Sequence, residues 1–176
     1  MYHTKMPNQS IRECDRCVAI TKSGSRCRNR TCKGKKCWIH TKGDEGLRIM
    51  PSQIRNAGDG LYATKRFKKG ERIADYTAEK LTRARVDQRY PGDVTAEYVL
   101  CRSDEECFDG RKTTSSFARF SNDARGSARF NNNARFTPGA RNRQPIMRAS
   151  RVITAGVEIF TNYGGGGYWN NSPRPG

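Results

Sequence analysis

Residues 153–164 read ITAGVEIFTNYG, a strand-like run that ends on an aromatic residue and leads into a run of four glycines. Glu158–Thr161 is expected to form a strand, because β-branched and aromatic residues favour the pleated conformation. Tyr163 follows that strand. Alone, such a tyrosine is best interpreted as a packing residue whose hydroxyl meets water. It becomes a catalytic candidate only if other motifs support it.

A second motif lies upstream, beginning at Asp109-Gly110 and running through SSFARFSNDARG. Its centre is ARFSN at residues 118–122, followed directly by Asp123. The surrounding segment 115–149 is poor in aliphatic residues and rich in Asn, Gly and Arg. Periodicity and composition therefore predict a loop here, and alone they indicate only a solvated one.

A third motif lies near the start of the expected β region: RNAGDGLYA at residues 55–63, followed by KGERIADY at 69–76. A single Gly-x-Gly is weak evidence of function, since it commonly marks a tight turn before a strand. Its functional value is a close backbone approach to a ligand, whose carboxylate the amides can hold.

Taken together and in this order, the motifs resemble the SET domain family of protein-lysine methyltransferases. That family begins with G-x-G-L-Y-A and K-G-E-x-I-x-x-Y, continues with R-F-I-N-H-S-C-x-P-N, and closes with I-x-A-G-E-E-L-x-x-D-Y-G. The middle motif departs from the pattern: Asp123 stands where the family has His, the Cys is absent, and an insertion precedes Asn133. The resemblance implies a mainly β fold, a SET-like β-clip of small sheets containing a pseudoknot.

The resemblance also implies S-adenosylmethionine as cofactor and assigns site residues. Tyr163 matches the catalytic tyrosine, and Tyr98 matches a tyrosine of the substrate channel, where Phe160 and Thr161 are also expected. Trp169 is expected either to contact the adenine or to complete the core. The expected cofactor contacts are Gly58, Asp59, Gly60, Leu61, Arg119, Phe120, Asn122, Asp123, Tyr163 and Trp169.

A separate motif occupies the first forty-odd residues, where the spacing is Cys17-x9-Cys27-x9-Cys37-x2-His40. Three thiolates and an imidazole satisfy a tetrahedral zinc site. The spacing is similar to that of short Cys3His basic modules in plant and large-virus proteins. Free thiols in a disordered basic arm are the alternative, and Cys14 or Cys32 could replace one of the proposed ligands.

The expected organisation is a zinc module and linker at residues 1–45, a SET-like domain at 46–170 and a tail at 171–176. Thr41–Glu45 is interpreted as a polar linker, and a short helix is expected between Thr77 and Tyr90. Strands are expected at Leu47–Met50, Gly60–Thr64, Arg72–Tyr76, Glu97–Cys101, Arg151–Ile153 and Glu158–Thr161.

Composition points to a polyanionic partner. The net charge is +17 over 176 residues, and Lys and Arg release counterions when they bind phosphates. No apolar run reaches the length of a membrane span, and the first ten residues lack the apolar stretch of a signal peptide. The expected location is therefore intracellular, nuclear or at viral chromatin; the sequence sets no oligomeric state.

The function that follows is an S-adenosylmethionine-dependent protein-lysine N-methyltransferase acting on a histone or another DNA-associated basic protein. Steering of a basic peptide would need local acid, and the cluster at 104–109 is expected to provide it. The alternative is a degenerate SET scaffold that serves as a zinc-assisted nucleic-acid-binding module.

Overall fold

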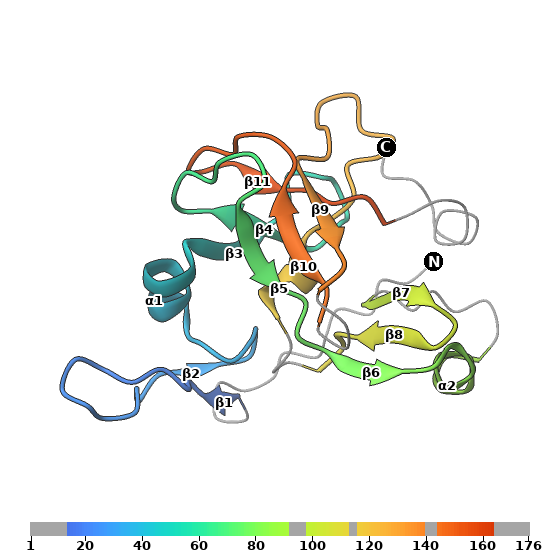
Figure 1. Cartoon of the computed structure of the whole chain (residues 1–176). Coiled ribbons are helices and arrows are strands. Elements are labelled where there is room, and N and C mark those ends of the chain that lie inside the picture. The colour runs from blue at the N-terminus through green and yellow to red at the C-terminus, as the bar shows by residue number, and fades with distance from the viewer. Residues whose placement is uncertain (1–13, 92–97, 113–115, 140–143, 164–176) are drawn as a thin grey trace.

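The computed structural model describes residues 14–91, 98–112, 116–139 and 144–163. Within these ranges the chain forms short antiparallel strands with few helical turns, which confirms a mainly β fold (Figure 1). In chain order the elements are β1 (Asp15–Arg16), β2 (Arg30–Thr31), α1 (Trp38–His40), η2 (Thr41–Glu45), β3 (Leu47–Pro51), β4 (Asp59–Ala63), β5 (Arg72–Asp75), β6 (Glu79–Leu81), α2 (Arg83–Arg89), β7 (Val99–Ser103), β8 (Glu106–Asp109), η3 (Phe117–Phe120), β9 (Ala134–Thr137), β10 (Ile146–Ala149) and β11 (Glu158–Ile159).

The strands beyond the N-terminal module form three small sheets, ordered β11-β4-β3, β5-β10-β9 and β6-β8-β7. The first two lie together in Figure 1, and the third carries α2 at its edge. Their inward faces share one apolar core. Its fully buried large side chains are Leu47, Leu61, Phe67, Phe108, Met147, Ile153 and Ile159.

The C-terminal strand is interleaved between two other segments. The Thr161 amide donates to the Asn122 carbonyl at 2.8 Å, and the amides of Asn133 and Ala134 both donate to the Phe160 carbonyl. Ala134 also forms a parallel bridge with Thr161. Residues 158–161 therefore lie between the 121–122 and 133–134 segments, which is the threaded arrangement that the resemblance implies.

Two expectations for the later half of the chain are wrong. The segment 115–149 is not all loop, because it contains η3, β9 and β10. Arg151–Ile153 does not form a strand; only Ile153 makes an isolated bridge, with Phe67. The missed strands are four residues long and mix polar with apolar side chains, so tertiary pairing decides their conformation.

Two nearer segments also differ from expectation. Thr41–Glu45 is a helical turn that continues α1 and ends at Gly46, whose φ of 69° is left-handed. The region 77–90 contains β6 before its helix α2, whose first turn is capped by Thr82. Here the capping hydroxyl accepts the Arg85 amide and fixes where the helix begins.

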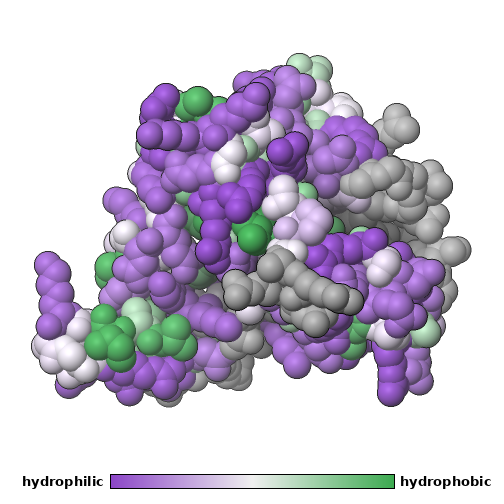
Figure 2. Space-filling model, viewed as in Figure 1, coloured by the Kyte–Doolittle hydropathy of each residue, from purple (hydrophilic) through white to green (hydrophobic). Residues whose placement is uncertain are grey.

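The N-terminal module contacts the β domain closely. A Cβ added at Gly34 would lie 2.5 Å from the Phe117 ring, so only glycine fits against that ring. Figure 2 shows a largely hydrophilic face on which hydrophobic residues gather at the module end, where Val18 and Ile20 are exposed. No helix in the described ranges is long and apolar enough to cross a membrane.

Candidate active site

The glycine loop between β3 and β4 is fixed by a fully buried carboxylate. Glu158 on β11 accepts from the Ser52 hydroxyl and the Gln53 amide, each at 2.7 Å, and from the Tyr62 hydroxyl at 3.0 Å. Burial and the nearby Glu158 charge raise the pKa of Tyr62 to about 12. A Cβ at Gly60 would lie 2.1 Å from Glu158 Oε1, so this position requires glycine.

The expected cofactor residues of this loop have distinct surroundings. Gly58 has a left-handed φ of 70° and open space where a Cβ would lie. The Asp59 carboxylate pairs with Lys33 Nζ at 2.6 Å, and its carbonyl accepts from Asn122 Nδ2 at 3.0 Å. Leu61 is fully buried in the core, so its side chain does not face a ligand.

Tyr163 is fixed at both its backbone and its hydroxyl. Its amide donates to Asp123 Oδ2 at 2.8 Å, and its hydroxyl donates to the Ser121 carbonyl at 3.1 Å. Asp123 is buried, and all of these contacts are within the chain. The structure thus brings Tyr163 together with the middle motif, and gives Asp123 nearby backbone amides as hydrogen-bond donors.

Tyr98 and Arg119 form a second part of the site. The Arg119 guanidinium lies 5.1 Å from the Tyr98 ring centroid and 4.5 Å from that of Phe120. Its Nη1 donates to the carbonyls of Gly110 and Arg111. Burial lowers the pKa of Arg119, although neighbouring tyrosines oppose that shift. A cation therefore lies against the tyrosine expected to line the channel.

Other expected site residues have different surroundings. Thr161 is fully buried, and its hydroxyl lies 3.1 Å from that of Ser121. Phe160 is buried with Ile54 and Ala124, its ring 5.4 Å from that of Phe130. Trp169 lies outside the described residues.

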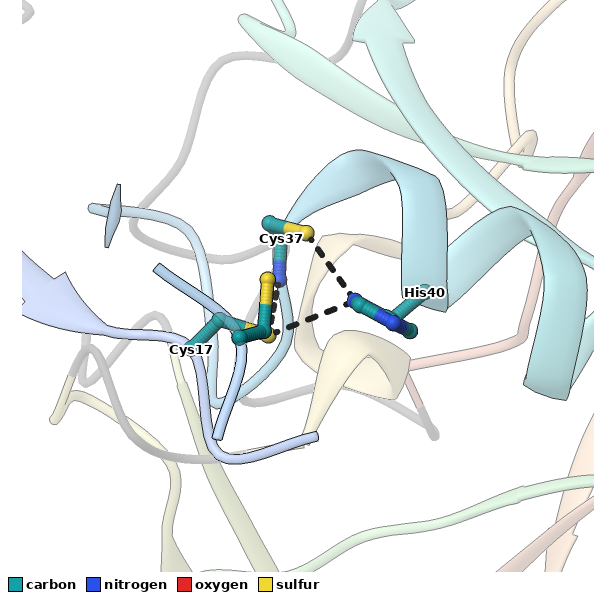
Figure 3. Close-up of side chains that lie close together, drawn as sticks. Cys17, Cys37 and His40 are labelled. Atoms are coloured by element: carbon teal, nitrogen blue, oxygen red, sulfur yellow. Dashed lines mark hydrogen bonds between the residues drawn. The ribbon is translucent and has the colours of Figure 1, made fainter. Parts of the chain in front are cut away.

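The four expected zinc ligands converge. The ligand atoms of Cys17, Cys27, Cys37 and His40 all lie within 4.8 Å of one another. His40 Nδ1 is 3.3 Å from Cys37 Sγ and 3.7 Å from Cys17 Sγ (Figure 3). Tetrahedral zinc, with bonds of about 2.0–2.3 Å, needs ligand separations of this order, so this donor set fits the metal.

The environment of the cluster favours the thiolate form at Cys37, whereas at Cys27 the hydrogen bond from the Asn29 backbone is outweighed by burial and the neighbouring thiols, which raise the pKa of Cys27. The Cys37 amide donates to Cys17 Sγ, and Asn29 Nδ2 donates to Cys37 Sγ. Burial would raise the pKa of Cys37, but hydrogen bonds from the His40 backbone and from Asn29 lower it to about 6. Cys14 and Cys32 form a disulfide with each other and are not part of this cluster.

The sequence matches a known protein family, and the fold is similar to solved structures. Residues 58–164, well over half of the chain, match the SET domain family. The chain belongs to the SET-domain family. This SET domain is similar in fold to ctPRC2 in complex with H3K27me3 and H3K27M, with 21% identity and a TM-score of 0.59, covering 81% of this chain and 16% of that one.

A second solved structure, the methyltransferase domain of human PR domain-containing protein 2, has 22% identity and a TM-score of 0.52. The match covers 77% of this chain and 87% of that domain. No curated protein matched the sequence. At these identities the two structures support the fold of the SET domain and nothing finer.

Sequence reasoning did not assign site roles to three residues of this SET domain. Glu158 was visible only as part of the closing motif, and no local pattern shows that it reaches Ser52. Tyr76 donates to the Tyr98 carbonyl at 2.6 Å and packs edge-on against Phe136. Asn132 donates to Asp123 from the segment 124–132, which is longer than its counterpart in the family pattern.

Proposed function

We propose that this protein is an S-adenosylmethionine-dependent protein-lysine N-methyltransferase. The observation that carries the proposal is the convergence of three motifs around β11. Glu158 holds the glycine loop, Thr161 pairs with Asn122, and Tyr163 follows directly, tied to Asp123. Membership of the SET-domain family supports the same activity.

The residues near the glycine loop suit the anionic end of this cofactor. Gly58 leaves open space beside the backbone, which lets a ligand approach its amides. Arg119 is buried, and among the described residues its Nε has no hydrogen-bond acceptor. A buried donor without a partner is costly. A cofactor carboxylate is an acceptor of the right charge for these donors.

Methyl transfer to lysine needs a neutral amine held in line with the methyl group. When bound, S-adenosylmethionine supplies an electrophilic methyl group on its sulfonium. A free lysine has a pKa of about 10.4, so the site must disfavour the ammonium form. Tyr98, whose ring lies against the Arg119 guanidinium, contributes an aromatic wall. Tyr163 orients the nitrogen through its hydroxyl, and the lysine proton leaves to water before transfer.

The substrate that fits best is a histone or another basic protein already bound to DNA. Half of the acidic cluster at 104–109 is paired within the chain, which weakens its attraction for a free basic peptide and leaves only Asp104 and Glu105 exposed. Asp109 is buried and pairs with Arg89, and Glu106 pairs with Lys80 and Arg102. With a net charge of +17, the protein would instead be drawn to the phosphates of a protein–DNA complex.

This substrate proposal gains support from the first structural neighbour, which was solved with H3 species. It also implies a location at nuclear or viral chromatin. The zinc module (residues 1–45) would act as the DNA-docking arm and residues 46–170 as the catalytic domain. In a radiolabelled methyl assay, nucleosomes should be methylated faster than free histones, and the difference should shrink as salt is added. Equal, salt-independent rates would reject the docking arm.

A degenerate scaffold that only binds nucleic acid is the second candidate, favoured by Asp123 in place of the family's histidine. Calorimetry with S-adenosylmethionine separates the two functions. The proposed enzyme must bind the cofactor and label a protein in cell extract. A protein that binds DNA but shows no heat of S-adenosylmethionine binding would support the scaffold function and reject the enzymatic one.

A further inference from the structure

Asp123 is a buried carboxylate with a full set of hydrogen-bond partners. Its side chain is completely shielded from solvent. Oδ1 accepts from the Arg125 amide and from Asn132 Nδ2, each at 2.8 Å, and Oδ2 accepts from the Tyr163 amide at 2.8 Å. Burying a carboxylate is costly unless such donors replace water, so the site is built around this charge.

Two of the three donors come from the segment 124–132, which has nine residues where the family pattern has four and is called the inserted loop below. This loop closes on itself, because Asn132 Oδ1 accepts the Ala124 amide at 2.9 Å while Nδ2 of the same side chain donates to Asp123. At the loop's far side, Phe130 packs on Phe160. The loop and the aspartate therefore satisfy each other's polar groups.

The third donor connects this network to the catalytic tyrosine. Tyr163 follows β11, and its amide bond to Asp123 fixes its backbone beside the middle motif. The Arg125 guanidinium strengthens the connection, because it lies 3.7 Å from Asp123 Oδ2 and hydrogen-bonds to the side chain of the adjacent Asn162. The direction of the Tyr163 side chain then follows from the position of its own backbone, which Asp123 determines.

We propose that Asp123 is a positioning residue for Tyr163, and that the inserted loop 124–132 supplies the donors that make an aspartate workable where the family has histidine. This inference rests on the proposed methyltransferase function. Asp123 acts through Tyr163 and does not contact the reacting atoms. A catalytic group misplaced by about 1 Å can lose on the order of a hundredfold in rate.

The test variant is Asp123→Asn, which keeps the shape of the side chain. Its amide oxygen can still accept from Arg125 and Asn132, but its NH2 then faces the Tyr163 N–H, and two donors cannot pair. We expect kcat to fall between about tenfold and a hundredfold, with the dissociation constant for S-adenosylmethionine within about twofold of wild type. Asp87→Asn, the same change on the exposed face of α2, should leave both unchanged.

A second readout does not depend on turnover. With nitrogen-labelled tyrosine, the Tyr163 amide should exchange with deuterium faster in Asp123→Asn than in wild type, because its acceptor is lost. Asn132→Ala should increase this exchange as well, whereas Asn131→Ala, an exposed neighbour, should not. These exchange rates test the hydrogen bond from the Tyr163 amide to Asp123 even if the wild-type protein shows no methyl transfer. Absence of methyl transfer by the wild type would instead reject the proposed function.

Two results would overturn the inference. One is wild-type kcat together with wild-type exchange at Tyr163 in Asp123→Asn. The other is a parallel loss of kcat, cofactor affinity and thermal stability, which would indicate a general packing role. Asp123→His with the loop intact is expected to be at least as impaired as Asp123→Asn, because imidazole cannot accept three hydrogen bonds. Full activity of that variant would also count against the loop's role.

Discussion

The zinc module and the SET domain are stabilised in different ways. In the described part of the module, the buried apolar cluster consists of Ala19 and three cysteines that converge with His40. The SET domain instead buries aromatic and aliphatic side chains from three sheets, and adds the buried carboxylates Asp123 and Glu158. We therefore expect the module to depend on a bound metal for its fold, whereas the domain folds through its own core.

Metal removal should separate the two regions most strongly. Zinc contributes about 10–16 kcal/mol of binding free energy in small zinc-dependent modules. Chelation or Cys37→Ser should therefore abolish amide protection in residues 14–40 while strands β4 and β10 stay protected. Hydrogen exchange with a zinc assay measures this. Lys22→Ala, an exposed change in the same module that leaves all four ligands and the Cys14–Cys32 disulfide intact, should retain zinc. If the amides of residues 14–40 stayed protected without metal, the module would not differ from the domain in the way described above.

Phe67→Ala should destabilise the SET domain and leave the zinc module folded, because the Phe67 ring is fully buried in the domain core. Truncation of such a ring costs about 3–5 kcal/mol. Urea unfolding followed on the SET domain should show this loss, and zinc should stay bound at urea concentrations below the transition. Lys68→Ala, an exposed neighbour, serves as control. A loss below about 1 kcal/mol would mean that the core carries less of the stability than its burial implies.

Glu158→Gln should have a smaller effect that remains within the domain. The amide keeps the shape of the carboxylate, but its NH2 only donates. Either the Ser52 hydroxyl, which donates to Oε1, or the Gln53 amide, which donates to Oε2, therefore loses its acceptor. We expect a loss of about 1–3 kcal/mol in unfolding free energy and weaker S-adenosylmethionine binding by calorimetry. A double-mutant cycle with Ser52→Ala should show coupling between the two residues. If the two changes in unfolding free energy were strictly additive, Glu158 would not stabilise the glycine loop through Ser52.

The smallest effect is expected at the contact between the two regions. Lys33 of the module pairs with Asp59 in the glycine loop, but about half of the Lys33 side chain is exposed. Lys33→Ala should thus change unfolding free energy by less than about 1 kcal/mol, with the change disappearing at high salt. Lys35→Ala controls for lost charge. A larger, salt-independent effect would show that the Lys33–Asp59 contact couples the folding of the module to that of the domain.

The features that could be predicted from the sequence are those set by residues close together in the chain. The cluster of Cys17, Cys27, Cys37 and His40 could be predicted because ligand type and spacing nearly define a zinc site. The strands β3, β4 and β5 could be predicted because short strand-like stretches alternate there with glycine-containing turns. The order of the motifs then identified the SET fold, including its threaded segment, which no periodicity would reveal.

What could not be predicted depends on contacts between distant residues. Glu158 and Ser52 are 106 positions apart, and Asp123 and Tyr163 are 40 apart. From the sequence, either the adenine amino group or a nearby amide could donate to Asp123, and only the fold shows that the amides of Arg125 and Tyr163 do so. Thr161 was expected at the channel because its neighbours match the family pattern, yet the fold buries it against Ser121.

The most direct test of the central claim compares wild type with Tyr163→Phe in a radiolabelled methyl assay on nucleosomes. The proposal predicts label on a lysine with the wild type. Loss of the hydroxyl should reduce the rate by about 10²–10³-fold, typical for one positioned polar group, without loss of zinc or of thermal stability. Equal labelling by both proteins, or none by the wild type despite bound S-adenosylmethionine, would contradict Tyr163 as the catalytic residue of a lysine methyltransferase.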